Sequence, residues 1–120
     1  MLVNEYLVST DSVVLPHPLG TIVLQNVLLW LRSEHLDIRY IATKILLRFS
    51  CEAENESVVN RQIINLVDSE CIYIKNLIVN RIYTAKGIWE KTRDYVISKC
   101  ESDECFIVRK VCAEQKKLHG

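Results

Sequence analysis

The segment "SEHLDIRYIA" (residues 33–42) decides the fold, because two further segments of the chain resemble it. They are "SECIYIKNLI" (69–78) and "DECFIVRKVC" (103–112). Each copy begins with serine or aspartate followed by glutamate, and each later places a β-branched residue directly before a basic one. The copies start about 35 residues apart. This self-similarity indicates one structural unit that is used three times.

The repeated residues are those of a helix start. Serine and aspartate are favoured N-caps, and glutamate next to them suits the positive end of a helix dipole. We therefore expect helices to open at Ser33, Ser69 and Asp103. Before each copy runs an apolar segment that ends just ahead of it, so each unit is predicted to be a pair of helices.

Apolar residues recur at three- and four-residue spacing from Gly20 onward, which is the helical period. Only 3 Gly and 2 Pro are present, too few for the turns of an all-β sandwich. The chain is predicted to be one all-α domain, 1–120. Its N-terminal segment, 1–19, is left open between a short helix and an extended stretch, and residues 50–57 are expected to form a polar loop. The three predicted helix pairs cover about 20–50, 55–84 and 87–119.

The segment "LLWLRSEHLDIRYIATKIL" (28–46) resembles the HEAT repeat. That family opens its second helix with an acidic residue and then a valine or isoleucine, an arginine and an alanine at set positions. The resemblance extends over about residues 20–118, and in the second copy Lys75 and Ile78 replace the arginine and the alanine. It implies an α-solenoid of about three antiparallel helical hairpins that stack into a superhelix.

Charge and composition limit the classes of partner and the compartment that we expect for this protein. Fifteen basic and fifteen acidic residues cancel, so no overall field draws the chain to nucleic acid or to an anionic membrane. No early basic residue precedes an apolar run, which argues against a secretory signal, and the most apolar stretch, 19–31, is too short to span a bilayer. Five irregularly spaced cysteines are typical of reduced, buried thiols. We expect a cytoplasmic protein.

Two clusters could be read as chemical sites. Glu34, His35 and Asp37 are residue types of acid–base catalysis, but no nucleophile or second histidine recurs beside them, and polar helix-start residues are the favoured interpretation. A zinc site could be assembled from the last cysteines and a histidine. These residues are Cys100, Cys105, Cys112 and His119. Their intervals of five, seven and seven residues do not match paired zinc ligands, and we expect neither a metal nor a cofactor.

The basic residue of each copy is predicted to pair with a carboxylate between helix pairs, since a single ligand site would need only one of them. These residues are Arg39, Lys75 and Arg109. Trp30 and Trp89 lie on apolar stripes and are expected to pack in the core.

Function is expected at the exposed positions of the second helices, because helical stacks bind through the surface that these helices line. No catalytic constellation supports an enzyme. A short chain of this kind is predicted to be a protein-binding module, for example a stoichiometric inhibitor such as a bacterial immunity protein that neutralises a toxin. The alternative is a nucleic-acid-binding relative of the HEAT-like DNA-repair glycosylases, because the last helix is basic. The predicted protein-binding residues are Tyr40, Thr43, Lys44, Tyr73, Asn76, Asn80, Lys110 and Glu114.

Overall fold

The computed structural model describes residues 13–14, 19–50 and 53–119. Within these residues the chain is helical, as predicted. The helices are α2 (Leu19–Trp30), α3 (Leu36–Arg48), α4 (Ala53–Ser69), α5 (Ile72–Arg81), α6 (Glu90–Glu101) and α7 (Phe106–His119). Two short strands add a parallel pairing, in which β1 (Val13–Val14) lies against β2 (Phe49–Ser50).

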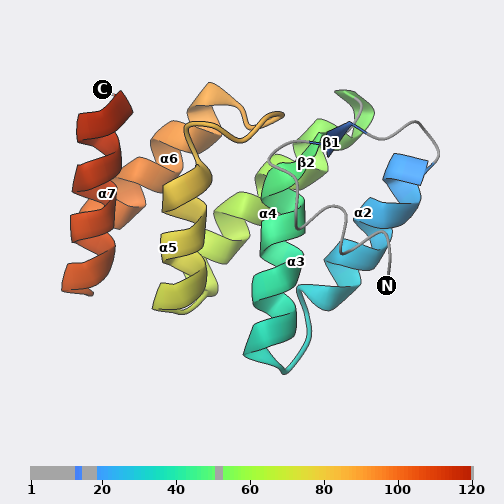
Figure 1. The fold of residues 1–120 in the computed structure, drawn as a ribbon, viewed down its shortest axis with the longest axis horizontal. Coiled ribbons are helices and arrows are strands. Elements are labelled where there is room, and N and C mark those ends of the chain that lie inside the picture. Colours follow the sequence, from blue (N-terminus) through green and yellow to red (C-terminus); the bar gives the residue numbers. More distant parts are fainter. Residues whose placement is uncertain (1–12, 15–18, 51–52, 120) are drawn as a thin grey trace.

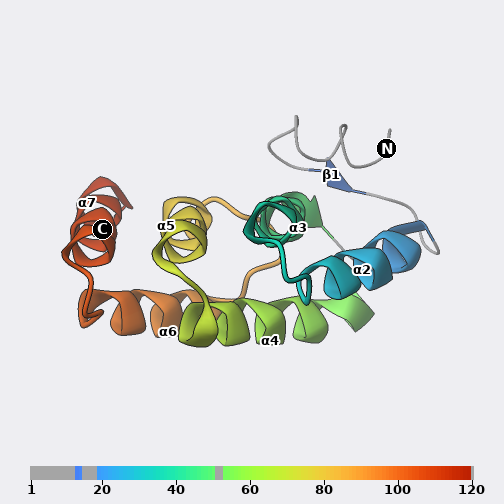
Figure 2. The same ribbon diagram turned by 90° about the horizontal axis from the view of Figure 1, so that it is seen from below.

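The helices form two layers. Helices α3, α5 and α7 lie side by side and run in the same direction (Figure 1). Helices α2, α4 and α6 form the second layer beneath them, which the turned view separates clearly (Figure 2). Each helix of the first layer packs on the helix that precedes it in the chain, and α5 also contacts both of its neighbours, α3 and α7.

The core lies between the two layers and follows the predicted apolar stripes. Its largest fully buried side chains include Ile45 and Leu46 of α3, Ile63 of α4, and Ile74 and Ile78 of α5. Ile45 and Leu46 lie three and four residues after the buried Ala42, and Ile78 lies four after Ile74, so that each helix turns one apolar stripe inward. Trp30 is partly buried and packs against this core, as expected from its stripe.

The three sequence copies fold alike at their helix starts. Helices α3, α5 and α7 begin at Leu36, Ile72 and Phe106, which are equivalent positions of the three copies. In each copy the basic residue donates its backbone N–H to the carbonyl of the residue just before the helix, at 3.0–3.2 Å. The pairs are Arg39 with His35, Lys75 with Cys71, and Arg109 with Cys105.

The predicted capping residues lie three positions before the helices. Ser33 Oγ accepts the His35 N–H at 3.1 Å, and Asp103 Oδ1 accepts the Cys105 N–H at 2.8 Å. These are side-chain turns that lead into the helix, not caps of its first turn. The cap predicted at Ser69 is wrong: Ser69 is the last residue of α4, and its hydroxyl donates to the Asn65 carbonyl at 2.7 Å.

The predicted polar loop at 50–57 is wrong from Ala53 onward, because α4 begins there. Alanine and glutamate are strong helix formers, and they extend this helix beyond its apolar stripe. The predicted N-terminal segment, 1–19, lies outside the described residues except for β1 and Leu19.

Candidate functional site

Ion pairs join successive helices of the α3–α5–α7 layer to the turn of the next unit. Arg39 of α3 donates from Nε to Glu70 Oε2 at 2.8 Å, and Lys75 of α5 donates from Nζ to Asp103 Oδ2 at 2.8 Å. All four side chains are largely buried. The prediction that the repeated basic residues pair with carboxylates between units is thus confirmed for Arg39 and Lys75. Because their charged groups are engaged in these ion pairs, we do not consider Arg39 and Lys75 further as ligand-binding residues.

Arg109 is the exception among the repeated basic residues. Its Nη1 donates to the carbonyl oxygens of Asp103 and Glu104, at 2.6 and 3.0 Å. Arg39 makes the equivalent bond to the Ser33 carbonyl at 3.0 Å, in addition to its ion pair. The guanidinium of Arg109 therefore fastens the turn before α7, and the carboxylate pairing predicted for it is wrong among the described residues.

The predicted binding residues gather in a groove between α3 and α5. Five of the eight line it, together with Leu77 and Arg81: Tyr40, Lys44, Tyr73, Asn76 and Asn80. Tyr40 and Lys44 stand one helical turn apart, and the Lys44 ammonium lies 5.9 Å from the centre of the Tyr40 ring. Asn80 accepts a hydrogen bond from the Gln115 amide at 3.2 Å, which links the α5 side of the groove to α7.

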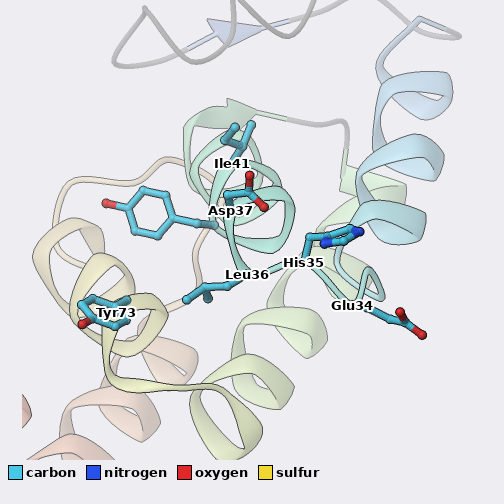
Figure 3. Close-up of a pocket in the computed structure, with 7 residues that line it drawn as sticks. Glu34, His35, Leu36, Asp37, Ile41 and Tyr73 are labelled. Atoms are coloured by element: carbon cyan, nitrogen blue, oxygen red, sulfur yellow. The ribbon is translucent and has the colours of Figure 1, made fainter.

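A second depression continues this groove past the first turn of α3. Tyr40 and Tyr73 line both hollows, and the second is completed by residues at the start of α3: Glu34, His35, Leu36, Asp37 and Ile41. Figure 3 shows Leu36 pointing toward α5, where Tyr73 lies. Leu36, Ile41 and Tyr73 are 38%, 43% and 62% exposed, which makes this depression an apolar surface open to solvent.

Three of the predicted binding residues are not in the groove. Thr43 was expected to face solvent, but it is fully buried, and its hydroxyl donates to the Arg39 carbonyl at 2.8 Å. Thr43 is equivalent in the repeat to Val79 of α5, which is also fully buried. Both residues therefore lie on the side of their helix that packs inside the molecule. Lys110 and Glu114 are exposed on α7, one helix further along the layer.

Sequence reasoning missed part of this surface. Leu36, Asp37 and Ile41 line it, although only the polar positions after the helix start were selected. Helical spacing contained the signal: Asp37 precedes Tyr40 by three residues and Lys44 by seven, and so shares their face of α3. Asp37 is also the residue equivalent to Tyr73 in the sequence repeat.

Glu34, His35 and Asp37 line the depression. Ser33, next to this cluster, accepts the His35 backbone N–H through its Oγ at 3.1 Å, which is a turn contact. Asp37 Oδ1 accepts the backbone N–H of Ile38 at 3.0 Å, which is a helix-start contact. This agrees with the interpretation of the cluster as polar residues at a helix start.

The cysteines of the described residues are free thiols. Cys100 and Cys112 are buried, whereas Cys71 and Cys105 are partly buried. Burial is the main cause that raises the pKa of Cys100 to about 12, and the nearby Cys112 and Asp103 add to it, so this thiol stays protonated at neutral pH. His119 stacks on Tyr83 with ring centres 4.8 Å apart. Within the described part of the chain, no three histidine, cysteine or acidic side chains are placed to hold a metal ion.

No protein-family profile, curated protein or solved structure matches this chain at a significant level. Among the described helices, none has the length and apolar character needed to cross a bilayer.

Proposed function

We propose that this chain is a non-catalytic protein-binding module, built as a HEAT-like stack of helical hairpins, and that the groove between α3 and α5 receives its partner. Two features support the stack. The three helix starts coincide in the repeat, and a basic residue of one unit pairs with an acidic residue of the next at both junctions. Such regular junctions are what a solenoid of repeated units requires.

The observation on which the binding proposal depends is the exposed aromatic and apolar surface at the groove. Tyr73 is 62% exposed beside Leu36 and Ile41, which are 38% and 43% exposed, and all three line one depression together with Tyr40. Tyrosine is enriched at protein interfaces because it offers apolar area and a hydroxyl at low entropic cost. A mixed polar rim with both charge signs favours a protein partner over a polyanion.

The proposal is tested by comparing what three forms of the full chain retain from extracts of the source cells. The groove variant has Tyr40→Ala and Tyr73→Ala, and the control variant has Gln25→Ala and Asn65→Ala in the α2–α4 layer. We expect one protein to be retained by the wild type and the control, and to be reduced at least about tenfold by the groove variant. Purified with the chain, it should bind in a one-to-one ratio.

Two results would contradict the proposal. The first is retention that the groove variant leaves unchanged. The second is salt-sensitive retention of the chain on duplex DNA at physiological ionic strength, which would support the nucleic-acid alternative. In the proposed role the chain acts in the cytoplasm as a stoichiometric partner. The toxin-neutralising immunity protein is one such role, and the identity of the retained protein decides it.

A further inference from the structure

The lining residues of α3 and α5 form two matched stripes along the groove. On α3 they are Asp37, Tyr40 and Lys44, and the equivalent residues of α5 are Tyr73, Asn76 and Asn80. Both stripes have the spacing i, i+3 and i+7, which keeps their members on one helical face. Seven residues of helix rise about 10 Å, so the groove offers roughly that length between its two ends.

The two ends of the groove are lined by side chains of opposite charge. Glu34 and Asp37 lie at the end where α3 and α5 begin. Lys44 lies at the other end, next to Arg81. Between them the surface is aromatic and apolar, with Tyr40 and Tyr73 shared by both hollows.

The helix dipoles weaken this polarity but do not reverse it. Both helices run in the same direction (Figure 1), so both positive ends lie beside Glu34 and Asp37. Each helix end is equivalent to about half a unit charge, and two full carboxylates therefore leave this end negative. At the other end, the Lys44 ammonium offsets the two negative helix ends beside it and is the group that an acidic side chain would contact.

We infer that the groove binds a bipolar segment of the partner protein, basic at one end and acidic at the other, with apolar side chains between them. This inference rests on the proposed function and adds the chemistry of the partner. The basic end of the segment lies over Glu34 and Asp37, its apolar centre contacts Leu36 and Tyr73, and its acidic end meets Lys44. Three extended residues cover about 10 Å, which matches the distance between the charged ends.

The test uses the full chain and three short fluorescent peptides with a shared leucine–phenylalanine–leucine centre. One peptide has lysines at one end and glutamates at the other, one has lysines at both ends, and one has glutamates at both ends. Affinity is measured by fluorescence polarisation, and the binding site by shifts of backbone amide resonances. We expect the bipolar peptide to bind the wild type about two- to fivefold more tightly than either uniform peptide, the range of an exposed charge pair. The shifts should centre on Tyr40, Lys44 and Tyr73.

A charge reversal makes the test specific. Lys44→Glu places acidic side chains at both ends of the groove and should move the preference to the peptide with lysines at both ends. Lys117→Glu, on the exposed face of α7, changes net charge equally and should leave the order of affinities unchanged. The inference is overturned if the bipolar peptide does not bind best or does not bind, or if Lys44→Glu does not change the order. The proposed function fails separately, when partner retention is insensitive to Tyr40→Ala and Tyr73→Ala.

Discussion

Asn60 holds the connection between α5 and α6 through a hydrogen-bond network that could not be predicted from the sequence. Its amide donates to the carbonyls of Glu56 and Gly87, at 2.7 and 2.9 Å, and its Oδ1 accepts the Trp89 N–H at 2.8 Å. The Trp89 indole in turn donates to Glu56 Oε2 at 3.0 Å. In the sequence, Asn60 is simply a polar residue between apolar ones, because two of its partners lie 27 and 29 residues further along the chain.

Asn60→Ala should lower the free energy of unfolding by roughly 2–4 kcal/mol, since it leaves the partly buried Gly87 carbonyl and Trp89 N–H without their partner. Urea denaturation of the variant measures the loss. Asn65→Ala, on the exposed side of the same helix, is the matched control and should change stability by no more than about 0.5 kcal/mol. Equal losses in the two variants would show that the network does not stabilise the fold.

The repeated basic residues show what can be predicted at the scale of single residues. Their spacing alone predicts pairing between units, and the pairs Arg39–Glu70 and Lys75–Asp103 confirm it. The sequence does not predict the case of Arg109, because its pattern matches that of Arg39. What differs is the surrounding structure, in which Arg109 meets carbonyl oxygens instead of a carboxylate.

Asp103 should contribute to the loss of stability in acid. Burial alone would raise the pKa of this carboxyl, but hydrogen bonds from Lys75 and from the Cys105 N–H outweigh it and hold the pKa below the usual 3.8. A lowered folded-state pKa stabilises the protein above pH 3.8, and this contribution disappears as the pH falls through the folded-state value. Asp103→Asn should therefore be less stable at pH 7 and should lose less stability between about pH 4 and pH 2. Urea denaturation across this range checks it, and an unchanged pH dependence would contradict the role of the pair.

At the scale of elements, apolar periodicity predicts the six helices, and the repeat predicts that three of them begin at equivalent positions. The period fails at the start of α4, where polar residues continue the helix before its apolar stripe begins. Periodicity reports burial, and a helix that extends past its buried face leaves no such signal. The high helix propensity of alanine and glutamate is the sequence signal for the start of α4, and the predicted loop at 50–57 did not take it into account.

Ile38 and Ile74 are equivalent in the repeat, yet their environments differ. Ile74 is fully buried on α5, which lies between α3 and α7, whereas Ile38 is 39% exposed on α3 at the edge of the layer. Ile74→Ala should cost about 2–5 kcal/mol of unfolding free energy, and Ile38→Ala about 1 kcal/mol or less. Chemical denaturation of the two variants provides the comparison. Similar losses would mean that packing between neighbouring helices of this layer is not the main source of their stability.

The two edges of the α3–α5–α7 layer differ in which residues they expose. At the α7 edge, Ala113 and Lys116 are exposed where the equivalent Val79 and Ile82 of α5 are buried. Phe106, seven residues before Ala113 and on the same face of α7, is 66% exposed as well. On the α3 edge, Ile38 and Ile41 remain 39% and 43% exposed.

Composition and repeat length predict the helical class of the molecule, whereas the shape of its surface needs the structure. Exposed residues were predicted one helix at a time, and five of the eight meet in one groove because α3 and α5 lie side by side in register. Thr43 was misplaced because the helical period does not say which side of α3 receives the next helix. The polarity of the groove emerges only when residues from both helices are combined.

The most direct test of the groove as a partner-binding surface is photo-crosslinking in the source cells. A benzophenone amino acid replaces Tyr73 in the groove in one form of the chain, and Asn65 on α4 in the other. We expect irradiation to join the Tyr73 form to one protein and to leave the Asn65 form without that product. Crosslinking of the same protein from Asn65 but not from Tyr73, or crosslinking of Tyr73 to nucleic acid alone, would contradict the account.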